Sequence, residues 1–346
     1  MRIALDALGG DFGAQPNVLG ALRAARELGC GVILVGDEAL IKAELQKAGS
    51  YDESKISVVH APQTINMDAN PARECRDKKD AGIVVCARLV KEGHADAMVS
   101  AGNSGAAMVA ALFGLGRIKG IDRPAIASPM PTRRGVSLLV DAGANADCKP
   151  INLLQFAVMG SIYSQIAYGV ESPVVGLLSI GEEDGKGNRL VKDTTKYIRQ
   201  LGLNYYGNLE GRDVHTGMAD VIVCDGFTGN IVLKLSEGLA RTMFGMIKDG
   251  VKKNPLALLG LLMAKPALSK IKDRTDPEVY GGAPLLGVDG QVIICHGKSG
   301  PQAIYNAIKI SARLVESKAV QNIARSMLAL KPVFEKLAEK KDEAAG

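Results

Sequence analysis

The chain has 346 residues, of which 47% are hydrophobic and 23% are charged, and its 42 lysines and arginines against 37 aspartates and glutamates give a formal net charge of +5. This length suits two domains, or one large domain with an added lobe. The mild positive excess favours an acidic substrate or partner. Nucleic acid is disfavoured because the chain has neither a basic arm nor an aromatic stacking platform.

Cysteine and histidine usage argues against a metal centre. The six cysteines are scattered without a CxxC pair, and the four histidines lack paired spacing. Reduced core thiols are therefore expected, and no metal. The N-terminal apolar run meets Asp6 too early for a signal peptide, which favours a cytoplasmic protein.

Apolar runs of strand length alternate with amphipathic segments of helix length along most of the chain. The runs lie at 2–8, 31–36, 56–61, 96–102, 125–130, 136–143, 172–181, 220–226 and 291–297. Helical segments are expected at 16–29, 71–94, 150–169 and 194–202. This alternation predicts an α/β fold with three α/β/α layers and a mostly parallel sheet. We expect one catalytic domain over residues 1–335, either undivided or as two lobes sharing one sheet, and a polar tail over 336–346.

Six of the apolar runs end in loops that combine glycine with Asn, Ser, Thr, Lys or Asp. These loops lie at 9–13, 101–106, 142–150, 181–188, 226–230 and 296–300. A single loop of this kind is usually a turn, but ligands collect at the carboxyl ends of strands in such sheets. Backbone N–H groups around glycine and at helix N-termini bind anions. We expect all six loops at one edge of the sheet, where together they predict a site for phosphate or an oxyanion.

Standard nucleotide and nucleophile motifs do not fit these loops. GEEDGKGN at 181–188 lacks the spacing and the Ser or Thr of a P-loop. The segment 114–120 misses GxGxxG by one residue, and neither GNSGA nor HGKSG matches the GxSxG nucleophile elbow. The residues alone therefore indicate an α/β protein that handles anions, without naming its reaction.

A short apolar segment with basic flanks lies at 254–268. Its uncharged stretch from Leu256 to Ala264 is far below the ~20 residues that span a bilayer. Asn254 suits an N-cap, Pro255 the first helical position, and Pro266 a helix end, which predicts a protruding helical hairpin over 250–272. Two interpretations remain open: a core or dimer helix, or a foot pressed into an anionic membrane surface.

Eight motifs follow one another along the chain: DALGGD (6–11), SAGNSGA (100–106), VDAGANADCKP (140–150), LLSIGEEDGKGN (177–188), NLEGRD (208–213), VCDGFTGN (223–230), YGGAPLLG (280–287) and HGKS (296–299). In these motifs and in their order, the chain resembles the PlsX family of acyl-acyl carrier protein:phosphate acyltransferases over roughly residues 1–330. Two mild departures are Leu8, where many members have Met, and Ser104, where many have Thr.

The resemblance implies a fold, a reaction and partners. The fold is isocitrate/isopropylmalate dehydrogenase-like. In the reaction, inorganic phosphate attacks the acyl thioester on acyl carrier protein, giving acyl phosphate for phospholipid biosynthesis and free carrier protein, with no cofactor. The resemblance also implies a homodimer that associates peripherally with the anionic inner face of the cell membrane, and the downstream glycerol-3-phosphate acyltransferase is a further candidate partner.

Such a reaction needs a phosphate cradle and oxyanion donors, but no serine or cysteine nucleophile. We expect Lys186 to supply the charged contact, Asn230 at a helix start to donate a hydrogen bond, and His296 to act as proton shuttle or donor. Each has a structural alternative: an exposed loop lysine, an N-cap, or a structural histidine. The expected phosphate- or acyl-phosphate-binding residues are Gly102, Asn103, Ser104, Gly105, Gly185, Gly187, Asn188, Thr228 and Gly229.

Two further sets complete the expected site. Carboxylates would repel phosphate, so an orienting role in the loops is expected for them. The loop-orienting set is Asp6, Asp11, Asn145, Asp147 and Asp225. Contact with the membrane or the acidic acyl carrier protein is expected from Arg241, Lys252, Lys253, Leu258, Leu261, Leu262, Lys270 and Arg274.

Two other functions compete with this one. The first is a nicotinamide-dependent hydroxy-acid dehydrogenase of the same fold, disfavoured because no convincing dinucleotide loop or metal-binding aspartate cluster is present. The second is a non-catalytic membrane adaptor that gathers acyl carrier protein, which would leave the six loops without a purpose.

Overall fold

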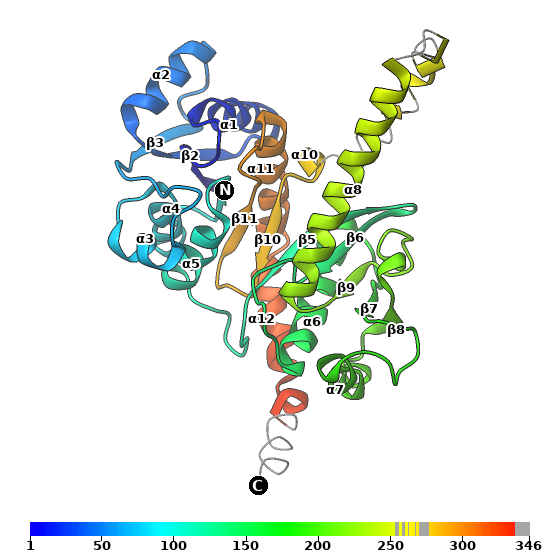
Figure 1. The fold of residues 1–346 in the computed structure, drawn as a ribbon. Coiled ribbons are helices and arrows are strands. Elements are labelled where there is room, and N and C mark those ends of the chain that lie inside the picture. Colours follow the sequence, from blue (N-terminus) through cyan, green and yellow to red (C-terminus); the bar gives the residue numbers. More distant parts are fainter. Residues whose placement is uncertain (253–255, 258–259, 262, 267, 270–276, 336–346) are drawn as a thin grey trace.

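The computed structural model describes residues 1–252, 256–257, 260–261, 263–266, 268–269 and 277–335 (Figure 1). Its first half contains β1 (Arg2–Asp6), α1 (Ala14–Leu28), β2 (Gly31–Gly36), α2 (Glu38–Ala48), β3 (Ile56–His60), α3 (Pro71–Asp77), α4 (Gly82–Lys91), β4 (Ala97–Ser100) and α5 (Ser104–Gly114). The second half contains β5 (Ala125–Thr132), β6 (Gly135–Val140), α6 (Pro150–Tyr168), β7 (Val174–Leu178), α7 (Arg189–Ile198), η1 (Arg199–Leu201), β8 (Asn204–Leu209), η2 (Gly211–Asp213), β9 (Val221–Val223) and α8 (Gly226–Lys252). The chain then adds α10 (Pro277–Tyr280), β10 (Ala283–Leu286), β11 (Gln291–Ile294), α11 (Pro301–Glu316) and α12 (Ala319–Ala329).

The strands form one 11-stranded sheet in the order β3-β2-β1-β4-β11-β10-β5-β6-β9-β7-β8. Among the described residues, pairing is antiparallel at β11–β10, β10–β5 and β5–β6, and parallel at the other junctions. The prediction of a mixed α/β fold with a mostly parallel sheet is therefore confirmed. The whole sheet continues across both halves of the molecule, which Figure 1 shows in blue to cyan and in green.

Alternate side chains of the strands point to opposite faces of the sheet, where the described residues form three hydrophobic cores. Ile3 and Leu5 of β1 belong to the core beneath α1, α6, α11 and α12, whereas Ala4 belongs to the core beneath α3, α4 and α5. This alternation follows from the period of two along a strand. Because helices cover both faces, the strands read as continuous apolar runs.

The prediction of six loops at one edge of the sheet is wrong. The strand β10 is antiparallel to both of its neighbours, and the β5–β6 hairpin reverses the direction again. As a result, β6, β9 and β7 run opposite to β1, β4 and β11. Three glycine-rich loops therefore leave each of two opposite edges, and local sequence carries no information on this reversal.

Two strands, and one division of a segment into two helices, were not predicted from the sequence. The strand β8 was missed because its residues NYYGNL include two asparagines and a glycine, and β10 because APLL is short and contains proline. The helix expected over 71–94 is divided into α3 and α4. The side chain of Asn70 caps α3 by accepting a hydrogen bond from the backbone N–H of Arg73, and the turn over 78–81 ends it.

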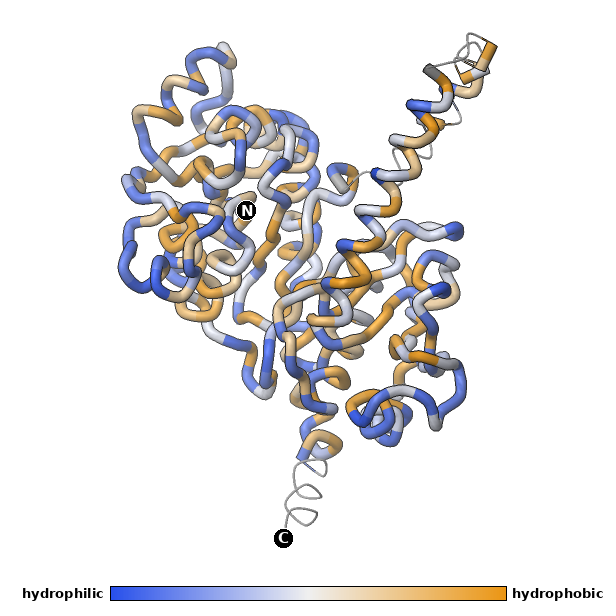
Figure 2. Tube along the Cα trace, in the orientation of Figure 1, coloured by the Kyte–Doolittle hydropathy of each residue, from blue (hydrophilic) through white to orange (hydrophobic). Residues whose placement is uncertain are grey.

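The helix α8 projects from the body with a row of exposed apolar side chains. In Figure 2 its hydrophobic segments recur along its whole length. Phe227, Ile231, Leu235, Leu239 and Met243 are spaced by four residues, so they lie on one side of the helix. Their exposed fractions range from 48% to 68%. Ten of the 23 residues of the expected hairpin at 250–272 lie outside the described residues, and within the described residues no helix is long and apolar enough to cross a membrane.

Candidate functional site

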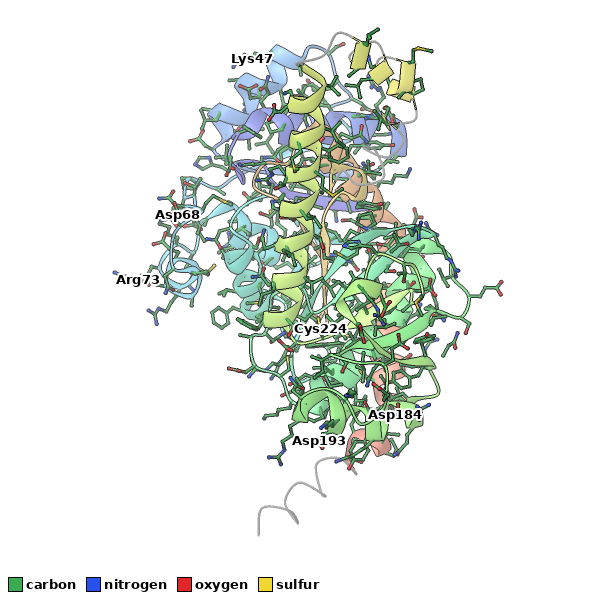
Figure 3. All side chains as sticks on the ribbon, turned by 45° about the vertical axis from the view of Figure 1, so that its right-hand side comes forward. Lys47, Asp68, Arg73, Asp184, Asp193 and Cys224 are labelled. Carbon is green, nitrogen blue, oxygen red and sulfur yellow. The ribbon has the colours of Figure 1, made fainter. Side chains whose placement is uncertain are left out.

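The loops after β6, β7 and β9 leave the same edge of the sheet side by side. These strands are neighbours in the order β6-β9-β7 and run parallel. Their loops carry Lys186, Asn145 and Asp147 among the expected site residues, and Asn230 lies in α8, which follows the loop after β9. Figure 3 labels Asp184 and Cys224, which mark two of these loops in the half of the molecule at the base of α8.

A buried carboxylate, Asp141, holds the loop after β6. Its Oδ1 accepts hydrogen bonds from the backbone N–H groups of Ile126 at 3.0 Å, Gly143 at 3.2 Å and Ala144 at 3.0 Å. Its Oδ2 accepts from the backbone and side-chain nitrogens of Asn145 at 2.7 and 2.9 Å. Burial raises the pKa of Asp141, and the hydrogen bonds from Ala144 and Asn145 act in the opposite direction. The sequence analysis missed this residue, although its place directly after an apolar run was a signal.

The loop after β6 interlocks with the start of α8 through two glycines. The backbone N–H of Gly226 donates to the carbonyl of Asn145 at 2.7 Å. A Cβ on Gly226 would lie 2.7 Å from the Asp141 Oδ2, and one on Gly229 would overlap the Asp141 carbonyl oxygen. The helix can therefore approach the loop this closely only where side chains are absent.

The first turn of α8 is capped by Asp225 rather than by Asn230. The carboxylate of Asp225 accepts from the backbone N–H of Thr228 at 2.8 Å and from its hydroxyl at 2.9 Å. Because the helix begins at Gly226, the expectation that Asn230 stands at its start is wrong. Asn230 is exposed in the following turn, beside the backbone of Gly143. It thus faces the loop after β6 and is not used as a cap.

The loop at 181–188 ends at a capped helix and leaves its lysine exposed. Asn188 caps α7 by accepting the backbone N–H of Val191 at 2.9 Å, which occupies its side-chain oxygen. Gly187 has a φ of 99°, and a Cβ there would meet Ser179 and Val191, whereas Gly185 stands in open space. The side chain of Lys186 is exposed at the surface of this loop.

At the opposite edge, Asp6 is buried at the end of β1. It accepts a hydrogen bond from the hydroxyl of Ser100 at 2.7 Å, and the close approach of Gly9 and Gly102 leaves no room for side chains beside it. Burial raises the pKa of Asp6 to about 6, against which the Ser100 hydrogen bond acts. The adjoining cavity, which Asn103 also lines, has space of about 20 Å³, enough for roughly one water molecule.

The raised pKa of Asp6 predicts a specific pH dependence of stability. Between the ordinary value of 3.8 and about 6 the folded protein binds more protons than the unfolded chain, so stability falls as pH rises through this window. Asp6→Asn cannot ionise and should escape this loss. In urea titrations, the unfolding free energy of the wild type relative to Asp6→Asn should fall by about 2 kcal/mol between about pH 4.5 and about pH 7.5. A pH-independent difference would contradict the prediction, and Asp52→Asn, at an exposed carboxylate, is the control.

Asn103, which is expected to bind phosphate, uses both its side-chain oxygen and its side-chain nitrogen in hydrogen bonds within the protein. Its Oδ1 caps α5 by accepting the backbone N–H of Ala106 at 3.0 Å. Its Nδ2 donates to the carbonyl of Met67 at 2.6 Å. Ser104 and Gly105 follow in the first turn of α5, and Ser104 is exposed. Both polar ends of the Asn103 side chain are thereby occupied.

His296 joins the loop after β11 to α8. Its Nε2 lies 3.3 Å from Oε1 of Glu237, and this hydrogen bond is the largest cause that lowers the pKa of Glu237. In the same loop, the carbonyl of Gly297 accepts the backbone N–H of Asp11 at 2.7 Å. The sequence analysis missed Glu237, because nothing in the helix pattern indicates a partner 59 residues away. His296 thus lies with Asp6 and Asn103 at the edge opposite Lys186.

Only some of the remaining expected site residues lie in the part of the chain that the structure describes. Asp147 is exposed, and the orienting contacts in its loop are made by Asp141 instead. Arg241 is exposed on α8, Lys252 ends that helix, and Leu261 is partly buried. The other expected membrane or carrier contacts lie outside the described residues: Lys253, Leu258, Leu262, Lys270 and Arg274.

Comparison with known proteins matches the chain to one protein family and to solved structures that share one fold. Residues 1–322 match the family described as fatty acid synthesis protein. A phosphate acyltransferase from Elusimicrobium minutum (strain Pei191) is 60% identical over 341 residues, which cover 99% of this chain and 100% of that protein. Among solved structures, a phosphotransacetylase from Streptococcus pyogenes has a TM-score of 0.63 at 19% identity, over 92% of this chain and 94% of that one. A 4-hydroxythreonine-4-phosphate dehydrogenase from Klebsiella pneumoniae has a TM-score of 0.54 at 13% identity, over 91% and 99%. At such identities these two structures show the fold alone.

Proposed function

Because this chain belongs to the fatty acid synthesis protein family, we propose that it is a phosphate acyltransferase that converts acyl-acyl carrier protein and inorganic phosphate into acyl phosphate and free carrier protein. The observation that carries this proposal is 60% identity over nearly the whole chain to a protein named phosphate acyltransferase. The glycine-rich loops add a chemical reason, since their N–H groups and helix starts suit an anion.

The proposed step needs no protein nucleophile. A phosphate oxygen attacks the thioester carbonyl carbon, and the carbonyl electron pair moves to oxygen to form a tetrahedral oxyanion. Collapse of this oxyanion re-forms the carbonyl, breaks the carbon–sulfur bond and releases the carrier thiolate, which takes up a proton. The protein contributes position and donors for the phosphate and the oxyanion.

We assign this step to the edge formed by the loops after β6, β7 and β9. Lys186 neutralises charge on phosphate, and the amide of Asn230 donates to phosphate or to the oxyanion. Exposure of both side chains beside parallel neighbouring strands supports this assignment. The backbone of Thr228 and Gly229 lies in the same region, where Asp141 and Asp225 fix the loops. His296 lies at the opposite edge of the sheet, so a role in connecting the two halves of the molecule suits it better than a role in proton transfer.

The activity is tested by mixing the purified protein with a long-chain acyl-acyl carrier protein and phosphate. Free carrier thiol and acyl phosphate should appear in equal amounts and only when phosphate is present. Thiol release without phosphate dependence would overturn the proposal. A parallel absorbance assay with a nicotinamide cofactor and a divalent metal tests the dehydrogenase alternative, and the adaptor alternative predicts neither product.

The exposed side of α8 supports a homodimer in which two copies of the helix pack together. Five apolar side chains at a spacing of four form a continuous stripe along it. Monomeric proteins seldom expose large contiguous apolar patches, and a two-fold axis would pair the stripe with itself. We further propose that Arg241 and the distal end of α8 face the acidic carrier protein and the anionic membrane surface. Transfer of acyl phosphate there to a glycerol-3-phosphate acyltransferase belongs to the same proposal.

The dimer is tested with the double substitution Leu235→Glu and Leu239→Glu. Each buried leucine contributes ~1.5–3 kcal/mol, and a two-fold interface contains each residue twice. Sedimentation velocity should therefore show a dimer for the wild type and a monomer for the double variant. Leu328→Glu on α12, at a leucine with 71% exposure, is the control and should remain dimeric. A monomeric wild type, or a dimeric double variant, would refute this interface.

A further inference from the structure

A buried asparagine of β8 is hydrogen-bonded to the turn that carries Lys186. Asn208 is only 1% exposed, and its Nδ2 donates to the carbonyl oxygen of Glu183 at 2.8 Å. The same oxygen accepts the backbone N–H of Lys186 at 2.9 Å. One carbonyl therefore links the interior of the sheet to the backbone of the lysine.

This bond explains why an amide is buried at position 208. Burying a polar side chain is unfavourable unless hydrogen bonds replace its contacts with water. The Oδ1 of Asn208 has no hydrogen-bond partner among the described residues. The contribution of the Asn208 amide to the structure is therefore the hydrogen bond that it donates to the Glu183 carbonyl. This bond holds the loop rather than the sheet.

Two ion pairs of the loop lie at its solvent-exposed surface. Glu182 pairs with Arg212 at 3.2 Å, and Asp184 pairs with Arg199 at 3.1 Å. All four side chains are more than half exposed, and water screens such ion pairs strongly. The Asn208 bond lies between these two pairs along the chain and is shielded from water on the Asn208 side. Of these three contacts of the loop, it is the one with a buried side-chain partner.

We propose that Asn208 is a positioning residue for the reaction, which sets the place of the Lys186 ammonium by fixing the Glu183 carbonyl. This inference rests on the proposed role of Lys186. The turn from Glu183 to Lys186 is closed by a single backbone hydrogen bond, so a shift of the carbonyl moves the lysine backbone with it. Small displacements of a group that aligns a reactant lower rates steeply.

The test compares Asn208→Ala with Asn204→Ala. Asn204 is the matched control because it lies in the same strand, and its Nδ2 also donates to a backbone carbonyl, that of Ser172 at 3.1 Å, away from the 181–188 loop. Asn208→Ala should lower kcat/KM for phosphate by about 10- to 100-fold. Amide hydrogen exchange should become faster in peptides that cover 181–188 and stay unchanged in β1 and β4. Asn204→Ala should leave both measurements unchanged.

A double-mutant cycle with Lys186→Ala then separates positioning from general weakening. If Asn208 acts through the lysine, Asn208→Ala should cause no further loss of kcat/KM in the Lys186→Ala background. Additive losses, or unchanged exchange in the loop, would overturn the inference. If Asn208→Ala does not fold, Asn208→Asp replaces the donor by an oxygen without opening a cavity, and the same outcomes apply. Full activity of Lys186→Ala would refute the proposed role of the lysine, and the catalytic part of the inference would fall with it. The hydrogen-exchange data would still show whether Asn208 holds the loop in place.

Discussion

Replacing Lys186 by alanine is expected to lower kcat/KM for phosphate by about 100- to 1,000-fold, the range typical for loss of one donor that stabilises charge in a transition state. The lysine is exposed, so its loss should change the free energy of unfolding by less than about 0.5 kcal/mol. Phosphate-dependent release of carrier thiol gives the rate, and urea unfolding gives the stability.

Two further variants show whether the effect belongs to this position. Lys192→Ala removes an exposed lysine from the adjacent α7 and should retain wild-type activity. Lys186→Arg keeps the positive charge but changes its geometry, and we expect intermediate activity. If Lys186→Ala stays within twofold of the wild type, the phosphate site does not involve this lysine, and Asn230→Ala becomes the next variant to measure.

The strands of the sheet were largely predictable because most of them are buried on both faces. Runs such as 31–36 and 291–297 have a continuous apolar centre, and the structure has β2 and β11 there. By contrast, β8 alternates exposed and partly buried residues before its buried end, so its composition resembles a loop. The direction of each strand was not predictable, since it depends on the position of β10 between β11 and β5, far apart in the sequence.

The loops were easier to locate than the partners of their side chains. The sequence analysis identified Asp225 and Asn145 as orienting residues, and both make hydrogen bonds within the loops, although no ligand tests their role. Asp147 was named as an orienting residue and Asp141 was not, although both are acids in one motif. Burial decides between them: Asp141 is fully buried among N–H donors, whereas Asp147 is exposed. The start of α8 contributes to this burial, because Gly226 and Gly229 lie against Asp141.

Packing between α8 and this loop leads to the second large expected effect, in which Gly229→Ala strongly destabilises the fold. A methyl group at 229 would overlap the Asp141 carbonyl oxygen and lie 3.1 Å from the Cys224 sulfur. Backbone at the end of a buried strand has little freedom to move away. We expect the free energy of unfolding to fall by ~3 kcal/mol or more, at the upper end of the range for overpacked sites.

A second glycine in α8 provides a control for which the opposite effect on stability is expected. Gly238 has no heavy atom within 4 Å of the position that a Cβ would occupy. In a helix interior, alanine is favoured over glycine by roughly 0.5–1 kcal/mol, so Gly238→Ala should leave stability unchanged or raise it. Both variants are measured by urea unfolding and, for Gly229→Ala, by activity below the unfolding transition. Equal stability of the two variants would show that the start of α8 can move away from Asp141, and the interlocked loops would then not fix the position of Asn230.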